Sequence, residues 1–234
     1  MKIVFTPDWF LGQDFLIEIF SFMILFLFFF FSVKSYKLDK NKKVLYLGLG
    51  FLLIALGEIS TILTKFVLYY DTTFTQNIGQ MIITYEAVKS VDIFYYLGFF
   101  LHKFLILFGL YIIYKLPLKK ISGDFFLTTY FIAISALLSH SLYYIYHLTA
   151  LIFLFLIINN YCKVYKKNKS VNTKILITAF SLLAISQIIF MLSKLPQLYV
   201  AAQNIQLISY ITLLILIMRI SKNGKKKKQN RDNI

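Results

Sequence analysis

The chain has 234 residues, of which 59% are hydrophobic and 18% aromatic, while only 15% are charged. Soluble domains are about 45–50% apolar and about 25% charged, so this composition and the mean hydropathy of +0.73 exclude an ordinary soluble protein. With a formal charge of +15, nine glycines and three prolines, an all-α polytopic membrane protein is the class that fits.

Seven apolar stretches predict seven transmembrane helices, because a helix needs about 20 mostly apolar residues to cross the hydrocarbon core. The predicted spans cover residues 10–33, 44–66, 93–116, 120–138, 142–161, 175–193 and 198–220. Residues 1–222 therefore form one seven-helix transmembrane domain. Residues 223–234 form a basic tail that we expect to be disordered.

The fourth and fifth spans come from one continuous apolar stretch. It runs for 37 residues, from Phe125 to Tyr161. A single helix of that length would measure about 55 Å, which is too long for one span and long enough for two short ones. The polar triplet Ser139-His140-Ser141 therefore predicts a turn between two helices.

The basic residues predict the orientation of the chain. Of its 25 lysines and arginines, 20 lie between spans 1 and 2, 3 and 4, 5 and 6, or after span 7, if the residues at the adjoining ends of these spans are included. Seven alternating spans place all of them on one side, which the positive-inside rule assigns to the cytoplasm. We expect a multi-pass cell-membrane protein with its N-terminus outside, whose lysines contact anionic lipids rather than nucleic acid.

The connection between spans 2 and 3 is the longest one predicted on the outer face. This outer loop, residues 71–89, contains a semi-polar segment from Thr75 to Tyr85. It is either a passive connector, or an amphipathic turn that lies on the membrane or covers a pocket. The sequence leaves these alternatives open.

An internal repeat is predicted from spans 2 and 6, which align without a gap at an offset of 129 residues. Phe51 then matches Phe180, and Glu58 falls opposite Gln187. Spans 3 and 7 align with His102 opposite Gln206. The pattern predicts two parallel three-helix repeats joined by span 4, an arrangement that places binding sites between the repeats.

Polar side chains inside the spans define the candidate site. Each ionisable group in the hydrocarbon costs about 2.5–3.5 kcal/mol, so it needs a partner or water. The candidates lie in the middle or outer half of their spans: Glu58, His102, His147, Gln187, Gln203 and Gln206. They predict a polar pocket open to the outside, with Glu58 and His102 as a ligand or proton site. The alternative is a structural clamp between helices.

Three lysines lie within the spans or close to their outer ends. Lys103 follows His102, while Lys65 and Lys194 lie near the outer ends of spans 2 and 6. A long lysine side chain can place its ammonium at the membrane surface while its Cα stays in the hydrocarbon. We therefore expect these lysines to snorkel rather than to join the site.

Catalytic and cofactor motifs are absent from the sequence. It contains no HExxH motif, no glycine-rich phosphate loop and no GxSxG motif. Span 7 has no central lysine for a retinal Schiff base. Three scattered histidines do not favour a metal site, and the single Cys162 excludes an internal disulfide. We expect no metal, no cofactor and no catalytic activity.

The segments Phe51–Gly57 and Asn204–Tyr210, together with the lysine-rich end, resemble uncharacterised archaeal seven-helix membrane proteins. They are also similar to the seven-helix sensor regions that precede histidine kinases. The polar residues in the outer half, together with the absence of a catalytic motif, favour a non-enzymatic sensor or receptor-like module. The resemblance implies that such a module acts through a separate cytoplasmic partner, and a homo-oligomer is the other arrangement that we consider. The alternative is a small secondary transporter in which two repeats rock around Glu58 and His102.

Overall fold

The fold is a helical bundle, described by a computed structural model of the chain. Its backbone is described for residue 10 and residues 12–40, 42–78, 81–116, 125–192 and 195–232, and its side chains over somewhat shorter ranges. These residues form seven helices and no strand: α1 (Gln13–Asp39), α2 (Lys42–Ile78), α3 (Met81–Lys115), α4 (Phe125–Leu138), α5 (Tyr144–Asn168), α6 (Val171–Met191) and α7 (Pro196–Asp232).

The described residues confirm the all-α prediction, and six of these helices are long and apolar enough to cross a membrane, which is consistent with a membrane protein. The exception is α4, which has only 14 residues and spans about 21 Å. The predicted turn at Ser139-His140-Ser141 is confirmed, since the chain leaves α4 after Leu138 and α5 begins at Tyr144. The predicted start of the fourth span, residues 120–124, lies outside the described residues.

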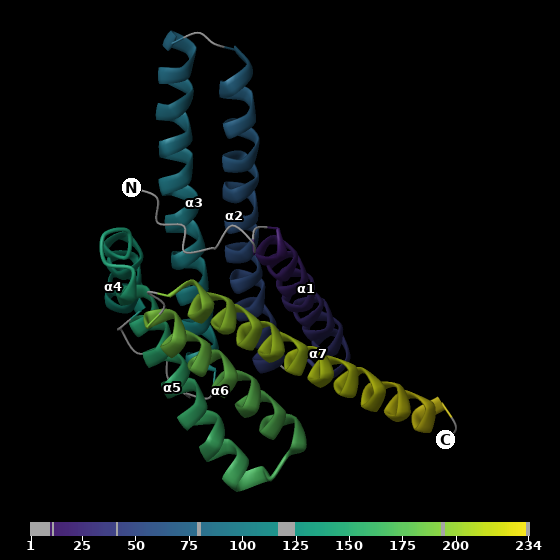
Figure 1. Cartoon of the computed structure of the whole chain (residues 1–234). Coiled ribbons are helices and arrows are strands. Elements are labelled where there is room, and N and C mark those ends of the chain that lie inside the picture. The colour runs from purple at the N-terminus through teal and green to yellow at the C-terminus, as the bar shows by residue number, and fades with distance from the viewer. Residues whose placement is uncertain are drawn as a thin grey trace.

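The helices form two groups of three neighbours (Figure 1). Helices α1, α2 and α3 pack in chain order, as do α5, α6 and α7. The groups meet where α1 packs against α7 and α3 against α5, while α4 lies beside α3 and α5. Because the connections are short, neighbouring helices run antiparallel, and the bundle has two distinct ends.

Those two ends differ in composition. One end, the polar end, holds the start of α1, the turn after α4 and the start of α7. The other, the lysine end, holds the α1–α2 connection around Lys40 and the α5–α6 connection around Lys169. At both lysine-end connections the backbone is left-handed, with φ of 51° at Lys40 and 44° at Lys169. In each, the lysine N–H donates to the carbonyl four residues earlier, in Tyr36 and Tyr165 respectively.

The structure differs from the predicted outer loop. Helix α2 runs on to Ile78 and α3 begins at Met81, so most of residues 71–89 is helical. The two helices project beyond the rest of the bundle (Figure 1). Between Phe66 and Ile78 the sequence has neither proline nor glycine. Extending an existing helix costs far less than starting one, which explains the continuation.

The same reason applies to the predicted disordered tail, where the structure differs again. Helix α7 ends at Asp232 and therefore includes most of residues 223–234. Lysine, glutamine and arginine are good helix formers, and α7 provides a preformed turn to extend.

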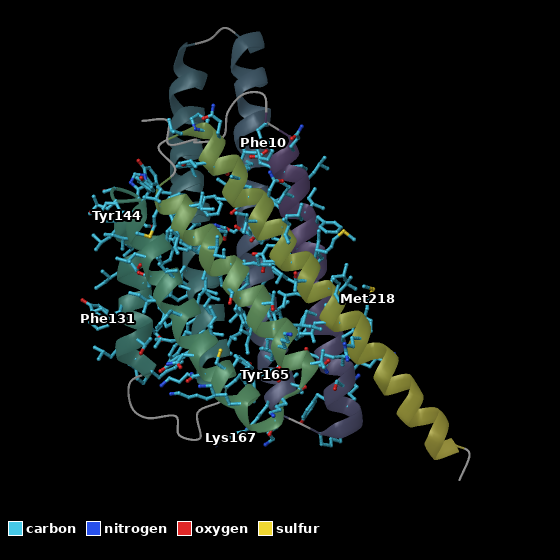
Figure 2. The ribbon with its side chains drawn as sticks, turned by 60° about the horizontal axis from the view of Figure 1, so that its bottom comes forward. Phe10, Phe131, Tyr144, Tyr165, Lys167 and Met218 are labelled. Carbon is cyan, nitrogen blue, oxygen red and sulfur yellow. The ribbon has the colours of Figure 1, made fainter. Side chains whose placement is uncertain are left out.

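The core is apolar, with a line of buried side chains running toward the lysine end. Leu25, Phe51, Ile113, Phe180 and Leu213 are fully buried. The rings of Phe51 and Phe180 stack between α2 and α6 at 6.2 Å, with an interplanar angle of 2°. Large apolar side chains also point outward from the bundle, among them Phe131, Tyr144 and Met218 (Figure 2). Exposed apolar side chains of this size suit contact with lipid.

Glycines bring α2 and α3 into close contact. A Cβ atom on Gly109 would lie 2.6 Å from the carbonyl oxygen of Gly50, which is backbone and cannot rotate away. A Cβ on Gly57 would lie 2.8 Å from Cγ1 of Ile106. Small residues at such points let helix backbones approach closely in membranes, and here they hold α3 beside the Glu58 region of α2.

Candidate functional site

Glu58 lies at the centre of the polar side chains. It is 3% exposed and projects from α2 toward α7. The hydroxyl of Tyr210 donates to Oε1 of Glu58 at 3.2 Å, and Nε2 of Gln206 reaches the same oxygen at 3.5 Å. Gln206 also donates to the Tyr210 hydroxyl at 3.1 Å. Glu58 therefore joins the α1–α3 group to the α5–α7 group.

The sequence left open whether His102 pairs with Glu58, and among the described residues its hydrogen bonds go elsewhere. Its Nδ1 lies 3.0 Å from the carbonyl oxygen of Gly57 and 2.6 Å from Oγ1 of Thr61. A carbonyl can only accept, so Nδ1 carries a proton and donates. Both partners lie on α2 at i and i+4, on the face that packs against α3. His102 fastens α3 to α2 beside Glu58.

His147 and Gln187 form a second polar contact, between α5 and α6. Nδ1 of His147 donates to Oε1 of Gln187 at 2.7 Å. The histidine ring also stacks on Phe190 at 5.2 Å, and Phe190 meets the ring of Tyr199 at 5.6 Å. The sequence predicted both polar residues but could not show that they are partners.

Gln203 and Gln206 lie on neighbouring positions of one face of α7, as their spacing indicates. They nevertheless have different partners. Gln203 is 8% exposed and donates to the Tyr199 hydroxyl at 3.1 Å, whereas Gln206 belongs to the Glu58 contact. Of the six predicted residues, the structure thus joins Glu58 with Gln206 and His147 with Gln187, while His102 and Gln203 bond elsewhere.

Lys65 forms ion pairs with two acids of α1, so the prediction that it merely snorkels is wrong. Its Nζ lies 2.6 Å from Oδ2 of Asp14 and 2.6 Å from Oε1 of Glu18. Asp14 is fully buried and Glu18 is 6% exposed. Glu58 interacts electrostatically with both Glu18 and Lys65, so this ion pair extends the polar cluster to α1.

A signal for this contact was present in the sequence. Asp14 and Glu18 are four residues apart, which places both carboxylates on the same face of α1. Asp14 also accepts hydrogen bonds from the backbone N–H groups of Gly12 and Phe15 at the start of α1. Two acids on one face of an apolar helix require a cation from a neighbouring helix.

Lys103 is buried rather than exposed at the surface. It is 6% exposed, and its Nζ donates to the carbonyl oxygen of Ser139 at 3.3 Å. The ammonium lies 3.6 Å from the ring centre of Phe99 and 5.2 Å from that of Tyr146. A helix C-terminus and aromatic faces both stabilise a cation. Lys103 therefore reaches the turn after α4 and fastens it to α3. Lys194, the third lysine that we expected to snorkel, lies outside the described residues.

The cluster occupies only one part of the bundle. Farther along each helix toward the lysine end, the large buried side chains are apolar, including Leu25, Phe51, Leu154, Phe180 and Leu213. Among the described residues, no group of three His, Cys, Asp or Glu side chains is arranged to hold a metal ion. The chemistry that the described cluster offers is hydrogen bonding and charge pairing.

Comparisons with protein-family models, with curated proteins and with solved structures find no match to this chain.

Proposed function

We propose that the chain crosses the cell membrane seven times, with the polar end outside and the lysine end in the cytoplasm. Six long apolar helices support most of these crossings. A crossing by α4 is supported by its packing along α3: Phe125 at its start contacts the rings of Phe108 and Tyr111. The Ser139 carbonyl just after its end accepts a hydrogen bond from Lys103. The clustering of lysines at one end supports the orientation.

We also propose that α1–α3 and α5–α7 are parallel repeats. The offset of 129 residues that relates Phe51 to Phe180 also relates Lys40 to Lys169, the two left-handed residues other than glycine in the described chain. It further relates the buried Leu25 to the buried Leu154. Phe51 and Phe180 stack on each other, as equivalent residues do beside a two-fold axis.

The function that this arrangement supports best is that of a sensor or receptor-like membrane module without catalytic activity. One observation carries the proposal: a buried polar cluster links both three-helix groups toward one end, while the large buried side chains beyond it are apolar. A stimulus from outside can reach the cluster, and the apolar layer transmits a change in packing. A separate cytoplasmic partner, or a second copy of the chain, would receive that change.

The sensor proposal is tested by measuring whether the cluster controls the distant lysine end. Spin labels at Lys34 of α1 and Lys163 of α5, both exposed, report the separation of the two groups. The Cys162→Ser background removes the native thiol. Glu58→Leu deletes the contact with α7, and we expect the label distance to change by about 1–2 Å or more. Ser135→Ala, which removes a hydroxyl contact between α4 and α5, should leave it unchanged. An unchanged distance in Glu58→Leu contradicts the proposal.

A transporter is the second candidate, and one observation favours it. The contact between Glu58 and Tyr210 lies between the two three-helix groups, where transporters built from parallel repeats bind their substrates. Proteoliposomes with an internal pH dye and an imposed proton gradient separate the two functions. If the protein is a sensor, protons should enter the proteoliposomes no faster than they enter liposomes without protein. A faster proton flux that Glu58→Leu abolishes would establish transport instead.

A further inference from the structure

Two carboxyl groups, Glu18 of α1 and Glu58 of α2, share the polar cluster with incomplete pairing. Both are buried, at 6% and 3% exposure, and they interact electrostatically. Lys65 pairs with Oε1 of Glu18, while Oε2 of Glu18 is buried without a hydrogen-bond partner. The hydrogen bonds to Glu58 come from Tyr210 and Gln206, which are both neutral.

The other charged and titratable groups around this pair are known from each helix that surrounds it. They are Asp14 on α1, Lys65 on α2, His102 and Lys103 on α3, Tyr146 and His147 on α5, and Tyr199 and Tyr210 on α7. The ammonium of Lys65 contacts Asp14 and Glu18 directly. The ammonium of Lys103 instead bonds the Ser139 carbonyl. Neither lysine forms an ion pair with Glu58 within the described residues.

The second group of helices shows what the same positions do when they carry neutral residues. At the repeat offset, Glu18 corresponds to His147 and Glu58 to Gln187. In that pair the histidine N–H donates to the amide oxygen at 2.7 Å. Two ionised carboxylates offer only acceptors, and burying both without a shared cation is costly. A donor equivalent to the His147 N–H can come from a proton on one carboxyl.

We propose that Glu18 and Glu58 form a proton-binding site, and that a proton taken up from the outer face is the stimulus of the sensor. This inference rests on the proposed function and names its ligand. Uptake adds one proton to the carboxylate pair, and release returns that proton to the outer face past the carboxylate of Asp14. Among the described residues, no three His, Cys, Asp or Glu side chains come together to bind a metal ion. A proton needs fewer ligands, because two carboxyl groups can share it.

Infrared difference spectroscopy on the full chain in lipid vesicles tests the site directly. The spectra are recorded as the pH is changed, because a protonated carboxyl has a C=O band that a carboxylate lacks. We expect the unmodified protein to show a pH-dependent carboxyl band that is missing from the spectra of Glu58→Gln, in which the other nine acids are kept. Tyr210→Phe keeps both carboxyls but removes a hydrogen bond to Glu58, so it should move the band without abolishing it. Asp232→Asn, at the end of α7, should leave the band unchanged.

The outcomes separate this inference from the proposed function. Absence of the band in the unmodified protein, or a full band in Glu58→Gln, overturns the proton site. A band that depends on added sodium or on an added primary amine also overturns it in favour of a cation site. If the band behaves as expected but the label distance between Lys34 and Lys163 does not change with pH, the proton site stands and the proton-sensing function falls.

Discussion

The two three-helix groups share a plan but differ in the charge that they bury. The buried charged side chains of the described residues are Asp14, Glu18, Glu58 and Lys103, all in α1–α3. The buried polar side chains of α5–α7 are neutral: Ser186, Gln187, Gln203 and Ser209. Buried charges are expensive in hydrocarbon and buried amides less so. The α1–α3 group therefore carries most of the free-energy cost of burying charge. The α5–α7 group lowers that cost with the neutral donors Tyr210 and Gln206, which contact Glu58.

Removing Lys65 should produce the largest effect in this comparison. Lys65→Met leaves Asp14 and Glu18 buried beside each other without their cation, and we expect a loss of about 3–5 kcal/mol in the free energy of unfolding. Denaturant titration in detergent micelles measures this loss. Lys65→Arg keeps the charge and should lose less. Equal stabilities of the two variants would show that the ion pair is not needed.

A substitution at the glycine contact between α2 and α3 should cause the next largest loss in the free energy of unfolding. Gly109→Ala places a Cβ against the carbonyl oxygen of Gly50, so we expect a loss of about 1–3 kcal/mol from overpacking. The proposed repeat relates Gly50 and Gly109 to Ala179 and Leu213 of the α5–α7 group, which are both fully buried. A neutral Gly109→Ala substitution, measured by the same denaturant titration, would mean that the two groups pack with the same spacing.

Deleting one hydrogen bond should cost more stability in the charged region around Glu58 than in a region with only neutral groups. Tyr210→Phe removes a donor to the carboxyl of Glu58, and we expect a loss of about 1.5–3 kcal/mol if that group is ionised. Ser135→Ala removes a contact with the neutral hydroxyl of Thr149, for which about 0.5–1.5 kcal/mol is expected. Thermal unfolding of both variants in the same lipid tests the order. A larger loss of stability in Ser135→Ala than in Tyr210→Phe would show that the Glu58 contact is not the more stabilising of the two.

The tail should show the smallest effect. Asp232→Asn lies beyond the last apolar window of α7, so stability should change by less than about 0.5 kcal/mol. A larger change in stability, measured by thermal unfolding, would mean that the end of α7 packs on the bundle and contributes to its stability.

The membrane class and the helix positions could be predicted from sequence because long apolar runs are a local signal. The turn at Ser139–Ser141 was predictable for the same reason. The partners within the cluster were not, because they depend on which helices become neighbours. The sequence of α2 does not indicate whether Glu58 will contact Tyr210 of α7 or His102 of α3.

Two misses had signals in the sequence. The four-residue spacing of Asp14 and Glu18 indicated a demand for a cation, which Lys65 meets. Tyr36, Lys37 and Lys40 recur at the repeat offset as Tyr165, Lys166 and Lys169. That match lies at the polar ends of α1 and α5 and in the turns that follow them, so apolar composition does not inflate it. Lys40 and Lys169 both have a left-handed backbone, which is one of the observations behind the proposed repeat.

The central claim is that Glu58 couples the two helix groups through Tyr210, and a double-mutant cycle measures that coupling. The free energies of unfolding of Glu58→Gln, Tyr210→Phe and the double variant are compared with that of the unmodified chain in the same lipid. Contacting residues show interaction energies of about 0.5–3 kcal/mol, and we expect a value in that range. Effects that add to within about 0.3 kcal/mol would contradict the claim.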